Sequence, residues 1–212
     1  MHFPRSSRSS AGVLTVTTLA AALLLGGCAS RGPLPTFYDF GPPAPQAATA
    51  QAAVAPLPVL VIADANGPSW LDSQRMYYRL LYADAQQSRP YAYNRWNTPP
   101  LQLLSQRLKT RVAQGGVKVL STTDAAAGIP LLRIDVDDFS QNFDSEKQSS
   151  GQVTLRASLF RGHQLLDQKT FSRNSRAASA DAQGGAQALA LASDAVAADL
   201  LAWLGTLNLP KE

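Results

Sequence analysis

The acidic residues between positions 135 and 146 are the side chains best spaced to do chemistry. This acidic group comprises Asp135, Asp137, Asp138, Asp144 and Glu146. Alternate residues of a β-strand point to the same face, so Asp135 and Asp137 would lie about 7 Å apart. Two carboxylates at that separation could hold a divalent ion or act as an acid/base pair. We favour a solvated strand face with Arg133 and Arg156 as neighbours, and we predict no metal site and no enzyme.

The inventory of side chains mostly excludes other catalytic sites. His163 is the one histidine beyond the first 27 residues, and it falls in a predicted hairpin turn that implies no pocket for a Ser-His-Asp arrangement. A single cysteine and a single histidine cannot build a Cys/His zinc site. No glycine-rich loop follows a strand and opens a helix, so no nucleotide site is indicated. The sequence therefore predicts a protein without a cofactor.

The N-terminus indicates export followed by lipid attachment. Arg5 and Arg8 precede an apolar run over residues 11–25, which is short for a membrane span and ordered like a secretory signal. Residues 25–28 read Leu-Gly-Gly-Cys and resemble the bacterial lipobox. That resemblance implies cleavage before Cys28 and attachment of acyl chains such as palmitate to it. Since no Asp follows the cysteine, the resemblance also implies the periplasmic face of the outer membrane.

Cleavage would leave 185 of the 212 residues and lower the formal charge from +4 to +2, because Arg5 and Arg8 leave with the signal. So small a charge on an exported protein makes nucleic acid an implausible partner. We predict a signal peptide over residues 1–27 and one folded domain over residues 58–208. Between them, residues 28–57 would hold the lipidated N-terminus, a first strand near residues 36–40 and a loose Ala/Pro-rich connector.

Hydrophobic patterning within the domain predicts a sheet and two helices. Strands are expected over residues 58–64, 75–82, 117–120, 131–139, 151–161 and 165–171. The last three would form an antiparallel meander, with residues 161–164 as a hairpin turn. Helices are expected over residues 99–112 and 181–207. The predicted fold is α+β, a mostly antiparallel sheet with two helices packed on one face.

Each helix should bury one stripe of apolar side chains. The stripe of the first helix would consist of Leu101, Leu104, Leu108 and Val112. Thr98 would cap that helix, with Pro99 as its first residue and two glycines at its end. The stripe of the second helix would consist of Leu189, Val196, Leu200, Trp203 and Leu207. Gly184 and Gly185 would fray its start, because each disfavours a helix by up to about 1 kcal/mol.

Aromatic rings and arginines alternate just before the first helix. This aromatic segment contains Arg89, Tyr91, Tyr93, Asn94, Arg95 and Trp96. The favoured interpretation is that the rings fill the gap between helix and sheet. The alternative is a contact surface for a protein partner or a lipid headgroup, with Tyr91, Tyr93 and Arg95 as binding residues. On that alternative Arg95 should be replaceable without unfolding, whereas Trp96 would be structural.

Residues 75–112 resemble the ABC-type transport auxiliary lipoprotein family, which includes the paraquat-inducible lipoprotein C group. The resemblance rests on Pro-Tyr-Ala-Tyr-Asn-Arg-Trp at residues 90–96, Pro-Pro at residues 99–100, and a Leu-rich helix carrying Arg107. It implies an outer-membrane docking piece for an MCE-type (mammalian-cell-entry) lipid transporter, which moves phospholipid across the periplasm. The implied partners are an MCE-domain protein and the ABC permease and ATPase of that system.

Two other functions stay open on the sequence alone. One is a structural or regulatory envelope lipoprotein that activates a cell-wall or outer-membrane assembly enzyme. The other is a hydrolase, for which the sequence offers only the acidic group. Association into a homo-oligomer is also left open.

Overall fold

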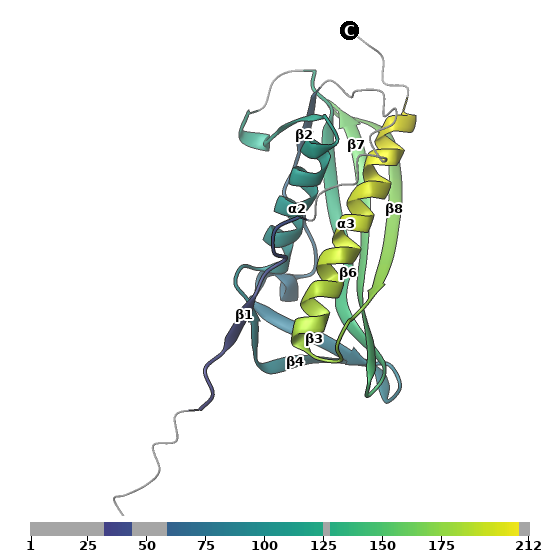
Figure 1. The fold of residues 1–212 in the computed structure, drawn as a ribbon. Coiled ribbons are helices and arrows are strands. Elements are labelled where there is room, and N and C mark those ends of the chain that lie inside the picture. The colour runs from purple at the N-terminus through teal and green to yellow at the C-terminus, as the bar shows by residue number, and fades with distance from the viewer. Residues whose placement is uncertain (1–31, 44–58, 125–127, 208–212) are drawn as a thin grey trace, which may run out of the picture. The chain divides into compact units, whose positions relative to one another are not determined.

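A mixed sheet covered on one face by two helices forms the domain that begins at Pro35 (Figure 1). The computed structural model describes residues 32–43, 59–124 and 128–207. Cys28, the signal peptide and the connector from residue 44 onward lie outside the described residues. The strands are β1 (Thr36–Tyr38), β2 (Val59–Ile62), β3 (Arg75–Leu80), β4 (Asp84–Trp96), β5 (Lys118–Leu120), β6 (Leu131–Ser145), β7 (Gln148–Arg161) and β8 (Gln164–Arg176). The helices are α2 (Pro100–Gln114) and α3 (Ala182–Thr206), with short 3-10 turns at Ser69–Asp72 and Thr122–Asp124.

Strand β6 is the centre of the sheet. One of its edges pairs with β7 in antiparallel fashion along almost the whole strand, and β8 continues the predicted meander. The other edge is shared, since β2 pairs with its first residues and β3 with residues 141–143, both in parallel. Beyond β2 lies β5, whereas beyond β3 lie β4 and then β1. On this side of β6 the sheet therefore divides into two separate groups of strands, β2 with β5 and β3 with β4 and β1.

Two features of the sheet differ from the prediction. Four short strand pairings are parallel, so the sheet of this α+β fold is mixed rather than purely antiparallel, although its longest pairings are antiparallel. Residues 84–96 form the long strand β4, where the sequence analysis expected no strand and placed only the aromatic segment. Most of β4 is exposed and it contains Pro90, so it lacks the apolar alternation that signals a half-buried strand.

Helix α2 confirms its predicted stripe. Leu104, Leu108 and Val112 are fully buried and Leu101 is nearly so, whereas Gln106 is exposed. The predicted cap is wrong, because the helix begins one residue later and no side chain bonds to its N-terminus. Arg107 and Arg111 are also buried, since α3 covers a second face of α2. A helix with one buried stripe was therefore too simple a description.

Helix α3 packs across β7 and β8, beside α2 and on the same face of the sheet (Figure 1). Asp181 caps it by accepting a hydrogen bond from the Gly184 N–H at 2.8 Å. Of the described helices, α3 alone is long and apolar enough to cross a membrane, with a mean hydropathy of 1.5. About three fifths of that apolar stretch, 61%, is buried inside the domain, as in the core helix of a globular fold.

The glycines at the start of α3 pack tightly rather than fray the helix. A Cβ on Gly185 would lie 2.0 Å from the Gln141 side chain. That side chain is itself fixed, because its amide donates to the Ser149 hydroxyl at 2.9 Å and to the Asp181 carbonyl at 3.0 Å. The expectation of a frayed start is wrong, because the missing side chain lets the helix end meet β6.

A close approach of α3 to strand β7 gives a stability prediction. A Cβ on Gly151 of β7 would lie 2.5 Å from the Leu189 backbone nitrogen, so Gly151→Ala must push α3 outward. We expect the free energy of unfolding in urea to fall by about 1–3 kcal/mol, more than the gain from a stiffer unfolded chain. Ser150→Ala, one residue away and half-buried, is the control and should stay within about 0.5 kcal/mol of the parent. Equal stability of the two variants would contradict this packing.

Candidate functional site

A large bulge in β4 organises the aromatic segment. Arg75 of β3 pairs with Arg95, but Tyr77, only two residues on, pairs with Pro90. Residues 91–94 therefore bulge out of the β3–β4 ladder and do not pair with any residue of β3. The Arg95 guanidinium closes the bulge by donating to the carbonyls of Tyr91, Ala92 and Asn94, at 2.6, 3.1 and 2.8 Å. Arg95 thus braces the backbone, so replacing it would disturb the fold as well as any contact it makes.

The Tyr91 ring points inward. Its hydroxyl donates to the Gln141 side-chain carbonyl at 2.9 Å, and its ring lies 4.6 Å from that of Tyr78. Burial, followed by the nearby Tyr78, raises the pKa of the Tyr91 hydroxyl well above its ordinary value. The neutral phenol is therefore a fixed donor to the buried amide. Tyr91 fits the interpretation in which the rings fill the gap between helix and sheet.

Tyr93 is the residue of the predicted binding set that reaches solvent most freely. Its side chain is 52% exposed, whereas Trp96 is 2% exposed and packs in the core. Phe37 of the neighbouring strand β1 is 55% exposed, and it pairs directly with Arg95. Phe37, which the sequence analysis did not name as a binding residue, therefore lies on the outer face of the β1–β4 edge, while Tyr38 pairs with Trp96 on the inner face. The exposed Tyr93 lies beside this edge, in the bulge of β4.

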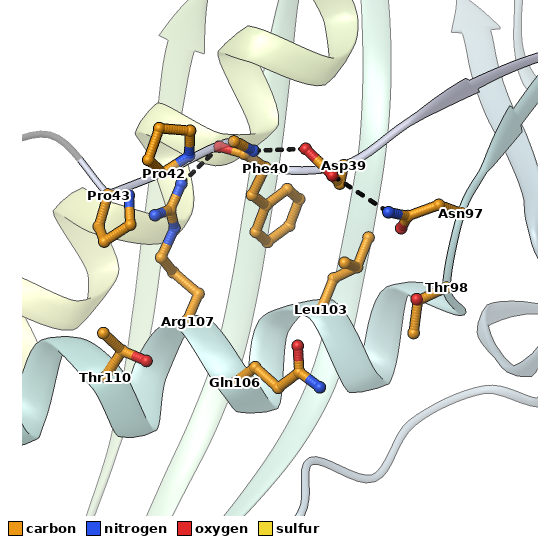
Figure 2. Close-up of a pocket in the computed structure, with 11 residues that line it drawn as sticks. Asp39, Phe40, Pro42, Pro43, Asn97, Thr98, Leu103, Gln106, Arg107 and Thr110 are labelled. Atoms are coloured by element: carbon orange, nitrogen blue, oxygen red, sulfur yellow. Dashed lines mark hydrogen bonds between the residues drawn. The ribbon is translucent and has the colours of Figure 1, made fainter.

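A pocket of about 380 Å³ lies between α2 and the segment after β1 (Figure 2). Figure 2 shows Arg107 rising from α2 to donate to the Phe40 carbonyl, at 2.6 Å. The Asp39 carboxylate accepts from Asn97 at 3.1 Å and from the backbone N–H of Gly41 at 2.7 Å. Arg107 therefore ties the segment after β1 to α2, whereas Asp39 ties it to Asn97 in the turn that precedes α2. The Phe40 ring continues into the core and lies 5.8 Å from Trp96.

The buried charges beneath this pocket join the two helices. Asp194 of α3 accepts two hydrogen bonds from Arg111, at 2.8 and 2.5 Å, and its carboxylate lies 3.3 Å from the Arg107 Nε. Burial lowers the pKa of Arg107, whereas the hydrogen bond to Asp194 raises the pKa of Arg111. One carboxylate thus serves two buried guanidinium groups. This cluster was not predicted, because neither arginine belongs to the apolar stripe expected for the first helix.

The acidic group does not converge on one point. The register of β6 against β7 passes from Val136 to Asp138 with a shift, so Asp137 lies in a bulge. Asp135 pairs with Arg156 at 3.5 Å, as the solvated-face interpretation expects. Asp144 lies nine residues along the same strand, about 30 Å away by strand geometry. Among the residues that the structure describes, no three His, Cys, Asp or Glu side chains are grouped closely enough to hold a metal ion.

His163 and Asp138 complete the set of candidate acid/base residues. His163 is exposed in the two-residue turn between β7 and β8, where Gly162 has a φ of 58°, so the predicted hairpin turn is confirmed. Burial raises the pKa of the Asp138 carboxyl, while its hydrogen bond to Ser140 acts in the opposite direction. These two residues lie at different places in the meander, so they do not form an acid/base pair.

The match to a known family covers nearly the whole described domain. The sequence profile of the ABC-type transport auxiliary lipoprotein component matches residues 38–200, from the end of β1 into the last turns of α3. The chain belongs to this family. The predicted resemblance is therefore confirmed, and the family is described as an auxiliary lipoprotein component of ABC-type transport. No curated protein matches the chain.

Solved structures share the auxiliary-lipoprotein fold. A crystal structure of a Xanthomonas campestris protein from the DUF330 family matches with a TM-score of 0.61 and 20% identity, covering 68% of this chain and 82% of that one. A crystal structure of an uncharacterised protein matches with a TM-score of 0.62 and 15% identity, covering 81% of this chain and 99% of that one. At these identities the likeness shows the fold alone.

Proposed function

We propose that this auxiliary lipoprotein is anchored at the periplasmic face of the outer membrane by acylated Cys28. There it docks an MCE-type ABC lipid transport system, whose MCE-domain protein, permease and ATPase are its partners. The observation that carries the proposal is the family match, which spans the domain from β1 to α3. The role is mechanical, because a docking piece needs a rigid body, an anchor and a contact surface.

The structure supplies the rigid body that this role requires. Residues 39–43 are tied to α2 through Arg107 and to the core through Phe40, although a connector separates them from β2 in sequence. A force applied at the lipid anchor would therefore be transmitted through β1 to the core of the domain.

Co-purification tests the proposal. The tagged protein is isolated from detergent-solubilised envelopes and its partners are identified by mass spectrometry. We expect an MCE-domain protein together with the permease and ATPase of the same system. Recovery of a cell-wall or outer-membrane assembly enzyme in their place would contradict the proposal and favour an envelope activator.

The anchor is tested separately by Cys28→Ser. Acyl chains hold a protein on a membrane because each buried methylene contributes about 0.8 kcal/mol. The variant should accumulate as an unacylated precursor that no longer fractionates with outer membrane. Mass spectrometry of the N-terminal peptide checks the acylation directly. Normal outer-membrane fractionation of Cys28→Ser would mean that another feature anchors the protein.

A further inference from the structure

We infer that the outer face of the β1–β4 edge, defined by Phe37, Tyr93, Arg95 and Arg75, rests on the phospholipid surface that carries the anchor. This inference rests on the lipid attachment in the proposed function. The outer face of the β1–β4 edge would then contact lipid, and the rest of the domain would be available to bind the transport partners.

The length of the tether limits which part of the domain can touch the membrane. Seven residues lie between Cys28 and Thr36, the first residue of β1, and the eight steps from one to the other span at most about 26–29 Å. Strand β6 alone, with 15 residues, is about 50 Å long. The anchor therefore keeps β1 near the lipid, while the far end of the sheet cannot be held there by the same tether.

The edge that is held near the lipid carries two aromatic side chains that are exposed to solvent. Phe37 and Tyr93 are 55% and 52% exposed. Phe37 lies on the face opposite the buried Trp96, and Tyr93 lies in the neighbouring bulge of β4. Exposed rings of this size are unfavourable in water but favourable at a membrane interface, where an aromatic body meets lipid and a polar tip stays hydrated. The β4 bulge, braced by Arg95, fixes Tyr93 in place before any contact forms.

The charges beside the rings fit a phosphate. Phe37 pairs with Arg95, and Arg95 pairs on its other side with Arg75 of β3. The Arg95 guanidinium is turned onto the carbonyls of its own strand, which leaves Arg75 as the cation that faces solvent on this edge. Arg75 is exposed, and guanidinium groups bind phosphate oxygens through paired hydrogen bonds. Every phospholipid headgroup supplies such a phosphate next to an apolar layer, which matches the rings.

Site-specific quenching tests the inference in the acylated full-length protein. The single native cysteine is used by the lipid, so Tyr93→Cys can be labelled alone with an environment-sensitive fluorophore. The protein is placed in vesicles of phosphatidylethanolamine and phosphatidylglycerol, with or without bromine on the acyl chains. We expect brominated lipid to reduce the fluorescence at position 93 by about twofold or more, as at an interfacial depth. Leu165→Cys and Leu191→Cys, at positions 47% and 56% exposed, are the matched controls and should be unaffected.

A charge reversal tests the phosphate contact. Arg75→Glu in the labelled protein should remove about half of the quenching, since a basic side chain loses its attraction to the anionic surface. Lys147→Glu, at the exposed tip between β6 and β7, should leave the quenching unchanged.

Three results would overturn the inference. The first is a label at position 93 that brominated lipid does not quench in acylated, anchored protein. The second is equal quenching at positions 93, 165 and 191. The third is loss of the quenching when the purified periplasmic MCE protein is added, because the face would then bind protein. If position 93 is quenched but no MCE protein co-purifies, the membrane contact is supported. The proposed docking to an MCE-type system is then contradicted.

Discussion

Asp194→Ala should lower the free energy of unfolding by about 3–5 kcal/mol, because it removes the one carboxylate that serves two buried guanidinium groups. The side chains of Arg107 and Arg111 are only 5% and 6% exposed. Water therefore cannot replace the lost partner without opening the contact between α2 and α3. The measurement is urea denaturation followed by circular dichroism.

Asp199→Ala is the matched control on the same helix. Asp199 also accepts two hydrogen bonds from one arginine, Arg173, at 2.5 and 2.7 Å. This pair is open to solvent, with side-chain exposures of 50% for Arg173 and 32% for Asp199. The loss should therefore be only about 0.2–1 kcal/mol. If the two alanine variants were equally stable, burial of the Asp194 cluster would not be what makes it important.

Leu108→Ala should lower the free energy of unfolding by about 2–5 kcal/mol. Leu108 is fully buried in the stripe of α2, so truncation leaves a cavity between the helix and the sheet. Leu104→Ala, also fully buried, should have an effect of the same size. Gln106→Ala on the exposed side of the same helix is the control and should be near neutral. Similar losses at all three positions would overturn the assignment of the stripe.

The parts of the fold that could be predicted follow from strong periodicity. Val153, Leu155, Ala157 and Leu159 alternate with polar residues, and all four are buried on one face of β7. The stripe of α2 was equally clear, because leucines recur at steps of 3 and 4. In both elements the apolar residues of the pattern pack on the core, so the sequence pattern directly reflects their burial.

The parts that failed depend on contacts between segments far apart in sequence. Strand β4 is polar because most of its residues face solvent on both sides, and its pairing with β1 and β3 leaves little pattern in the chain. A glycine is needed at position 185 because any side chain there would clash with Gln141, which lies more than forty residues earlier in the chain. The burial of Arg107 and Arg111 needs Asp194 on another helix. Such relationships cannot be inferred from local propensity.

The candidate site was predicted in part. The sequence located the aromatic segment, and the structure places Tyr93 at the surface and Trp96 in the core. The sequence alone could not show whether Arg95 binds a partner or closes a bulge, because the backbone carbonyls that Arg95 binds leave no pattern in the sequence. Phe37 was missed because its neighbour on β4 is more than fifty residues away.

The central claim, that this lipoprotein docks an MCE-type transport system, is tested most directly by binding in a defined lipid environment. The acylated protein is placed in phospholipid nanodiscs and titrated with the purified periplasmic part of the MCE protein from the same cell. The account predicts saturable binding with a Kd in the micromolar range or tighter, corresponding to about −8 kcal/mol. Empty nanodiscs should bind none of it. No binding to the loaded nanodiscs above that of empty ones would contradict the account.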